Sequence, residues 1–236
     1  MPDADAPKGS TPPDSSTPSI TTCQAVTFDL DGLLFNTESI YVKVGDTILQ
    51  RRGKRFTREL IDQMMGLPTP LALQRMIDFH GLDATVEELQ AEGDALFPEL
   101  LDRYLAPMPG APELLESIER AGIPRGIATS SRRHIVDLIM ERTGWRDRFA
   151  FILTAEDVAR GKPEPDIYLE SARRLEVEPA RMMVLEDSTQ GAQAAVAAGC
   201  YTVAVPGPHS RHQQFPPVQL VAETLEDPQI RRLLGL

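Results

Sequence analysis

Short apolar runs alternate with segments of helical periodicity through most of the chain. The run 25–28 predicts a buried strand, because it is apolar, rich in β-favouring residues and soon followed by a turn at Gly32. Similar runs predict four further strands, at 126–128, 151–153, 183–185 and 202–205. Apolar residues at helical spacing predict the accompanying helices, at 111–121, around 135–139, at 166–175 and around 192–196. Strands that alternate with helices of this length form a parallel sheet covered on both faces, so the sequence predicts an α/β fold.

The segment that follows the first strand has a different pattern. It contains no convincing strand, and its apolar positions predict helices at 40–52, 58–65, 71–80 and 86–104. The residues Pro107-Met108-Pro109-Gly110 are typical of a stiff linker. We therefore expect a helical cap over 38–107, inserted between the two parts of a core, 23–37 and 108–236.

The N-terminal segment is rich in Pro, Ser, Thr and Asp, and it carries neither an apolar stretch nor a basic cluster. A segment so poor in large apolar side chains cannot offset its ordering entropy, so we expect a disordered tail over 1–22. The pattern matches neither a signal peptide nor a membrane span. Later in the chain no apolar run reaches membrane length, so no membrane partner is expected.

Composition narrows the class of protein without choosing a function. Of the 236 residues, 42% are hydrophobic and 25% charged, as in soluble globular proteins. The net charge of -11 would repel nucleic acid phosphates, so no nucleic acid partner is expected. Two cysteines, Cys23 and Cys200, are too few for a disulfide framework and suggest buried thiols in a reducing, cytoplasmic compartment. We expect a monomer or a weak homodimer.

Polar groups suited to phosphate chemistry follow four of the predicted strands. They are Asp29 and Asp31 after the first, Thr129 and Ser130 after the second, Lys162 after the third, and Glu186 and Asp187 after the fourth. Ligands of open parallel sheets bind at the carboxyl ends of the strands. These side chains should therefore converge, although they span more than half of the sequence.

Such a cluster is suited to attack on a phosphate monoester. The carboxylates of Asp29, Glu186 and Asp187 are hard oxygen ligands that suit Mg2+. With Mg2+ and Lys162 neutralising the phosphoryl oxygens, Asp29 can attack phosphorus and form an aspartyl-phosphate that water hydrolyses. Asp31 stands two residues further on and suits a general acid and then a general base.

Two smaller features complete the expected site. Thr129, Ser130 and the neighbouring backbone amides would hold the phosphate. Gly32 fits a sharp turn beside the reacting centre, where a side chain would intrude.

Four segments of the chain resemble, in order, the four motifs of the haloacid dehalogenase superfamily. They are Phe28-Asp29-Leu30-Asp31-Gly32, Ile127-Ala128-Thr129-Ser130-Ser131, Gly161-Lys162-Pro163-Glu164-Pro165-Asp166 and Leu185-Glu186-Asp187-Ser188. The helical insert resembles the cap of the subgroup that contains phosphoglycolate phosphatases and β-phosphoglucomutase. The resemblance implies a Rossmann-like core, Mg2+ held in part by the Asp31 backbone, and a small phosphorylated metabolite as substrate.

The resemblance leaves a sugar phosphomutase as the alternative function. Mutases of this subgroup carry a histidine in the first cap helix, where this chain has Tyr41, and an arginine in a later cap loop that is absent from 66–70. Both differences favour hydrolysis. A dehalogenase is disfavoured because that branch lacks the aspartate at the position of Asp31, and Lys43 is a weak candidate for the lysine of a phosphonatase. A catalytically silent binding module is a further alternative.

Other residues are interpreted structurally or as departures from the family pattern. Many relatives have Asp where this chain has Asn36, so a hinge contact should differ here. Asp166 is expected to cap the following helix. The four histidines share no metal-ligand spacing, so no zinc site is expected.

Overall fold

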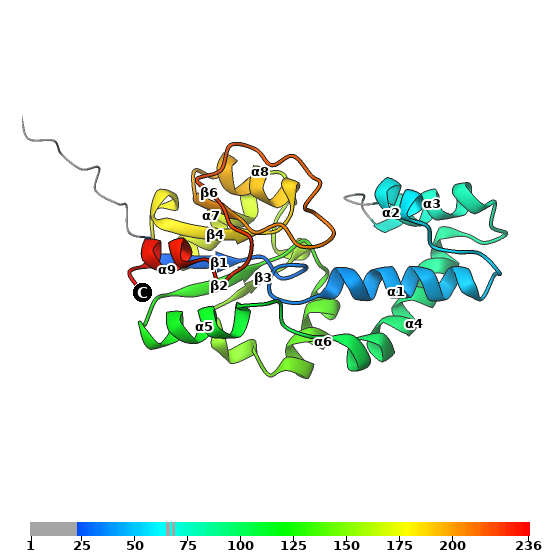
Figure 1. Ribbon diagram of the computed structural model, residues 1–236, viewed down its shortest axis with the longest axis horizontal. Helices are drawn as coiled ribbons and strands as arrows, with labels where there is room; N and C mark the ends of the chain where they lie inside the picture. Colours follow the sequence, from blue (N-terminus) through cyan, green and yellow to red (C-terminus); the bar gives the residue numbers. More distant parts are fainter. Residues whose placement is uncertain (1–22, 65–66, 68) are drawn as a thin grey trace, which may run out of the picture.

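A six-stranded parallel sheet forms the centre of the molecule (Figure 1). The computed structural model describes residues 23–64, 67 and 69–236. The strands, given in their order across the sheet, are β3 (Ile152–Leu153), β2 (Arg125–Ala128), β1 (Ala25–Phe28), β4 (Met182–Glu186), β5 (Tyr201–Ala204) and β6 (Leu220–Val221). The predicted α/β fold is confirmed. The change of direction in strand order lies at β1 and β4, where ligands of such sheets bind.

Helices cover both faces of this sheet and also form a separate lobe. The helices are α1 (Thr37–Gln50), α2 (Arg58–Met64), α3 (Thr69–His80), α4 (Val86–Tyr104), α5 (Ala111–Arg120), α6 (Arg133–Thr143), α7 (Asp166–Arg174), α8 (Thr189–Ala197) and α9 (Pro228–Leu234). The pleat of β1 divides its side chains between the faces: Val26 and Phe28 pack with the side of α5 and α6, and Ala25 with the side of α7 and α8. A strand buried on both sides explains why its sequence is apolar without alternation.

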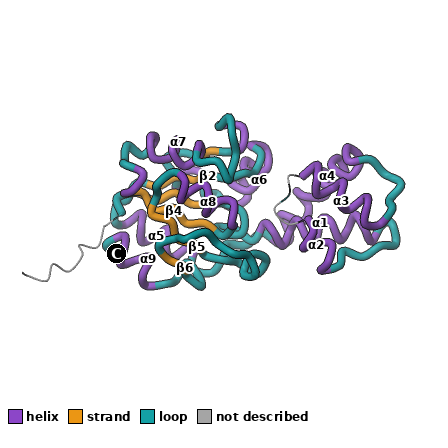
Figure 2. Tube along the Cα trace, turned by 90° about the horizontal axis from the view of Figure 1, so that it is seen from above, coloured by secondary structure: helices purple, strands orange, loops and turns teal. Residues whose placement is uncertain are grey.

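Helices α1–α4, here called the helical lobe, lie to one side of the sheet region (Figures 1 and 2). The lobe has its own packing, because Ile40, Val44 and Ile48 form one stripe of α1 that faces the apolar side of α4. Thr85 and Glu88 form a capping box that starts α4. The expected helices of the insert are thus present, and the division of the chain into core and cap stays a prediction.

The chain passes from the sheet region to the helical lobe at Asn36 and returns near Ala106. These two points are called the crossings. Asn36 Nδ2 donates to Tyr104 O at 2.9 Å, and its Oδ1 accepts from Ala106 N at 2.8 Å. The backbone N–H of Asn36 also donates to Ala106 O at 3.1 Å. An aspartate could accept from Ala106 but could not donate to Tyr104 O, so an aspartate at this position would lose one of the two side-chain hydrogen bonds.

The structure differs from the prediction at two places. The strand expected at 202–205 was predicted to be the last; it is β5, but β6 pairs with it in parallel and is followed by α9. Asp166 is the first residue of α7 rather than its cap, which is Pro165, and its carboxylate pairs with Arg160. The predicted tail over 1–22 lies outside the described residues. Both cysteines are free and buried, as expected.

Among the helices in the described part of the chain, none combines the length and the apolar character that crossing a membrane requires.

Candidate active site

The carboxyl ends of β1, β2 and β4 bring most of the expected site residues together. Asp29 follows β1, and Thr129 follows β2. Glu186 is the last residue of β4, and Asp187 follows it. Lys162 comes from the long connection between β3 and α7. Parallel strands in register end at the same edge, so residues more than 150 positions apart in the sequence meet there.

The Lys162 ammonium lies at the centre of the cluster. It donates to Asp29 Oδ1 at 2.6 Å, to Glu186 Oε1 at 2.6 Å and to Ala128 O at 2.9 Å, which uses all three of its protons. Its side chain is 4% exposed. Burial alone would lower the pKa of Lys162, but the carboxylates of Asp29 and Glu186 outweigh it and raise that pKa well above its ordinary value.

The Asp31 carboxylate is held by three hydroxyl groups. Thr37 Oγ1 donates to Asp31 Oδ1 at 2.7 Å, and Thr129 and Ser131 donate to Asp31 Oδ2 at 2.9 and 2.7 Å. Thr37 begins α1, so the helical lobe contributes directly to the position of Asp31. Sequence analysis singled out Thr129 but neither Thr37 nor Ser131, and the expected phosphate ligand Ser130 is exposed beside them.

Asp187 supplies a buried carboxylate oxygen that lacks a hydrogen-bond partner within the described part of the chain, Oδ2. Ligand oxygens of Asp29, Glu186 and Asp187 all lie within 4.8 Å of one another. Burial, followed by the charge of Asp29 and Glu186, raises the pKa of Asp187 well above its ordinary range. An acidic cluster with an unpartnered oxygen fits a divalent cation, because the cation would satisfy the oxygen and relieve the repulsion.

The turn at Gly32 brings Glu38 to the same cluster. Gly32 has a φ of +79°, and a Cβ at this position would overlap Asp187 Oδ2 and lie 3.2 Å from Glu38 Cδ. Only glycine therefore allows this close approach. Burial, then the charges of Asp31 and Glu186, raise the pKa of Glu38 to about 7. Glu38 was not among the predicted site residues, because its electrostatic partner Asp187 is 149 positions away in the sequence.

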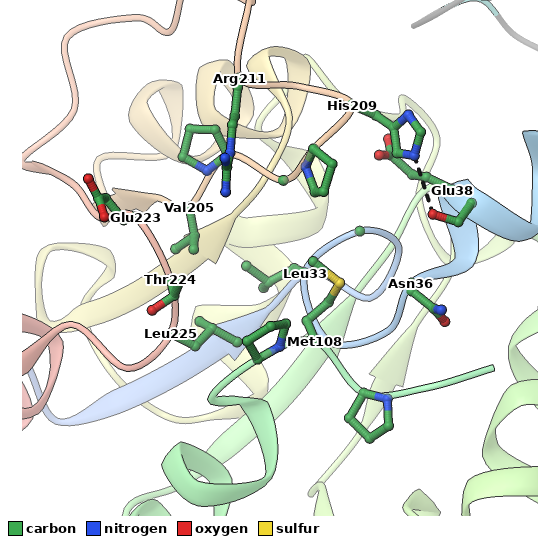
Figure 3. A pocket seen from close by; sticks show the side chains of 17 residues that line it. Leu33, Asn36, Glu38, Met108, Val205, His209, Arg211, Glu223, Thr224 and Leu225 are labelled. Atoms are coloured by element: carbon green, nitrogen blue, oxygen red, sulfur yellow. Dashed lines mark hydrogen bonds between the residues drawn. The ribbon is translucent and has the colours of Figure 1, made fainter. Parts of the chain in front are cut away.

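A cavity of about 270 Å³ lies next to Glu38, between the crossings and the loop after β5 (Figure 3). Its polar lining includes Asn36, Glu38, His209 and Arg211. Ser39 Oγ and His209 Nε2 are 3.3 Å apart, so this loop of the sheet region touches the first turn of the helical lobe.

The arrangement defines an α/β enzyme with a buried acidic site, and a family comparison gives its class. The model of the haloacid dehalogenase-like hydrolase family matches residues 26–205. The chain therefore belongs to this family of hydrolases. Enzymes of the family generally use a divalent metal ion, typically Mg2+, and the acidic cluster at Asp29, Glu186 and Asp187 is consistent with that.

Similar proteins point to phosphatases. The chain is 34% identical over 182 residues to a bifunctional riboflavin kinase/FMN phosphatase of Arabidopsis thaliana, covering 77% of this chain but only 48% of that protein. It is 34% identical over 208 residues to a probable pseudouridine-5′-phosphatase of Drosophila melanogaster, covering 85% of this chain and 89% of that protein. The crystal structure of CbbY from Rhodobacter sphaeroides in complex with phosphate has 26% identity and a TM-score of 0.76, covering 91% of this chain and 100% of CbbY. Together with the family match, these relatives place the chain among the phosphoric monoester hydrolases.

Proposed function

We propose that this enzyme hydrolyses small phosphate monoesters, of the sugar or nucleoside monophosphate type, through a phosphorylated Asp29. The observation that carries the proposal is the Lys162 ammonium fixed at 2.6 Å from Asp29 Oδ1, beside Asp31 and the unpartnered oxygen of Asp187. A buried cation next to a carboxylate nucleophile stabilises the negative charge that develops on the phosphoryl oxygens during attack.

Asp29, Glu186 and Asp187 would hold Mg2+, and the resemblance to the family adds the backbone carbonyl of Asp31 to this set. The bound ion would supply positive charge to the phosphoryl oxygens and lower the repulsion among these carboxylates. The fit rests on the orphaned Asp187 Oδ2 and on a donor set made only of oxygen atoms.

The reaction then needs two steps from the chain's own side chains. Asp29 attacks phosphorus, and Asp31 gives a proton to the oxygen of the leaving alcohol. Asp31 next takes a proton from water, which attacks phosphorus and releases phosphate from Asp29. Lys162 and Thr129 would each exchange one present hydrogen bond for a phosphoryl oxygen, and Ser130 and the backbone amides after β2 would hold the other phosphoryl oxygens through both steps.

We further propose that the helical lobe is a cap, residues 38–107, that closes over the bound substrate. Closure would exclude bulk water from the site, and opening would release the alcohol. The substrate class follows the names of the relatives, which include phosphatases for pseudouridine 5′-phosphate, FMN and glycerol 3-phosphate.

Phosphate release from p-nitrophenyl phosphate and a panel of sugar and nucleoside monophosphates tests the proposal, with Mg2+ or with EDTA. Wild type should need Mg2+, and Asp29→Asn should lose more than about 1,000-fold in kcat while its circular dichroism stays unchanged. Asp83→Asn, the same change at an exposed aspartate of the helical lobe, is the matched control. The absence of release from every ester by folded wild type would contradict the proposed activity.

A further inference from the structure

Tyr168 is the largest of the fully buried side chains, and its phenol hydroxyl contacts the acidic cluster. It lies in the first turn of α7 and donates to Glu186 Oε1 at 2.7 Å. Its ring also faces Lys162, with Nζ 5.1 Å from the ring centroid. Tyr168 thus touches both partners of the buried ion pair, although the family motifs do not include it.

Glu186 has little freedom to change its orientation. Its second oxygen, Oε2, accepts from Ser188 N at 3.1 Å and Ser188 Oγ at 2.9 Å. The first turn of α8 lies against the carboxylate so closely that a Cβ on Gly191 would overlap it. The carboxylate is therefore held on one side by α8 and on the other by Lys162 and Tyr168.

We infer that Tyr168 is a positioning residue for the proposed phosphatase reaction and acts through Glu186 on Lys162. The phenol and the ammonium share one oxygen, Glu186 Oε1. Because the phenol satisfies part of the negative charge on that oxygen, the ammonium is not drawn fully to Glu186 and keeps its short contact with Asp29. The inference rests on the proposed function, since it assigns Lys162 a role at the reacting phosphoryl group.

If Tyr168 only filled space in the core, Tyr168→Phe would leave kcat unchanged. Phenylalanine can occupy the same space in the buried apolar cluster that contains Tyr168 together with Ala128, Leu153 and Val184. Tyr168→Phe should therefore keep the packing and lose only the hydroxyl. The lost contact is a buried hydrogen bond to a charged acceptor, the kind with the largest individual effects.

Steady-state kinetics on p-nitrophenyl phosphate at saturating Mg2+ test the inference. For Tyr168→Phe we expect kcat to fall about tenfold with KM within about twofold of wild type, and with an unchanged circular dichroism spectrum. The matched control is Ser171→Ala, which removes another fully buried hydroxyl from α7, one that bonds to Ile167 O rather than to the cluster. It should leave kcat unchanged.

A double-mutant cycle separates action through Glu186 from an independent effect. If Tyr168 acts through Glu186, Tyr168→Phe should have no further effect on kcat in a Glu186→Gln background. Three outcomes would each overturn the inference and leave the proposed function standing. They are multiplicative losses of kcat in the double mutant, a loss of equal size in Ser171→Ala, and a kcat of Tyr168→Phe within twofold of an active wild type. A wild type without turnover would overturn both.

Discussion

An ion pair at the centre of the sheet region and one in the helical lobe differ sharply in their burial. In the sheet region Lys162 and Glu186 are 4% and 0% exposed, and their hydrogen bonds reach Asp29, Ala128 and Tyr168 in three other segments of the chain. In the helical lobe Arg58 and Asp62, one turn apart on the same helix, are 62% and 45% exposed. Buried charges cost desolvation energy and depend on every partner, whereas exposed pairs are screened by water. The difference is consistent with the proposed chemistry, which needs a charged group held in a fixed position in the sheet region.

Replacement of the buried Lys162 is expected to show the largest difference between the two regions. Lys162→Met should lose more than about 1,000-fold in kcat and, in EDTA, destabilise the fold by about 3 kcal/mol, because it leaves Asp29 and Glu186 buried without a counter-charge. The exposed Lys54→Met in the lobe should change the free energy of unfolding by less than about 0.5 kcal/mol. Urea unfolding and phosphate release measure both effects, and similar stabilities for the two variants would contradict the contrast.

Two glycines inside helices give a second test of the same contrast. A Cβ on Gly191 in α8 would overlap the Glu186 carboxylate, whereas one on Gly93 in α4 would meet only Val44 Cγ1 at 3.5 Å and Ile48 Cδ1 at 3.9 Å. Gly191→Ala should therefore destabilise the protein by about 2 kcal/mol and reduce kcat. Gly93→Ala should stabilise it by about 0.5 kcal/mol, because alanine favours the helix.

Thermal and urea unfolding of these two variants, with kcat measured on the same preparations, supply the check. Equal destabilisation in both would show that the packing against Glu186 is not tighter than the packing inside the lobe.

Much of this picture could be predicted from the sequence, for a physical reason. Strands β1 to β5 are short apolar runs, and the rule that ligands bind at the carboxyl ends of parallel strands predicted that Asp29, Lys162 and Asp187 would meet. Strand β6 could not be found in this way, because it has two residues and Val221 is 60% exposed. It is a strand only because β5 offers it a free edge.

The contacts that were missed all depend on distant parts of the chain. The hydroxyl of Tyr168 reaches Glu186 only because α7 packs against β2 and α8, and helical spacing alone predicts just that Tyr168 is buried. Asp166 was expected to cap α7 because aspartate often does so, but the nearby Arg160 offers its carboxylate an ion pair instead. The phosphate, metal and acid/base roles of the site residues stay predictions until the variants are measured.

Glu38 lies where the two regions meet, and its expected effect is on stability alone and appears only as the pH changes. Its carboxylate belongs to the lobe but faces Asp31, Glu186 and Asp187 of the sheet region, and its pKa is raised to about 7. Glutamate in an unfolded chain has a pKa of about 4.3, so the folded state holds the proton more tightly. This contribution to stability is full below about pH 4.3 and is lost as pH rises through 7.

Glu38→Gln cannot ionise and should therefore gain in stability relative to wild type as pH rises. In EDTA, the free energy of unfolding of Glu38→Gln minus that of wild type should rise by about 2 kcal/mol between pH 5 and pH 8. This value allows for partial exposure of the side chain. Glu59→Gln, at an exposed glutamate in the first turn of α2, supplies the baseline. Mg2+ should shrink the shift, because the cation offsets the carboxylates that repel Glu38. A difference that stays constant between pH 5 and pH 8 would mean that Glu38 does not share the electrostatic field of the acidic cluster, and that the two regions are less tightly joined than the contact at Gly32 indicates.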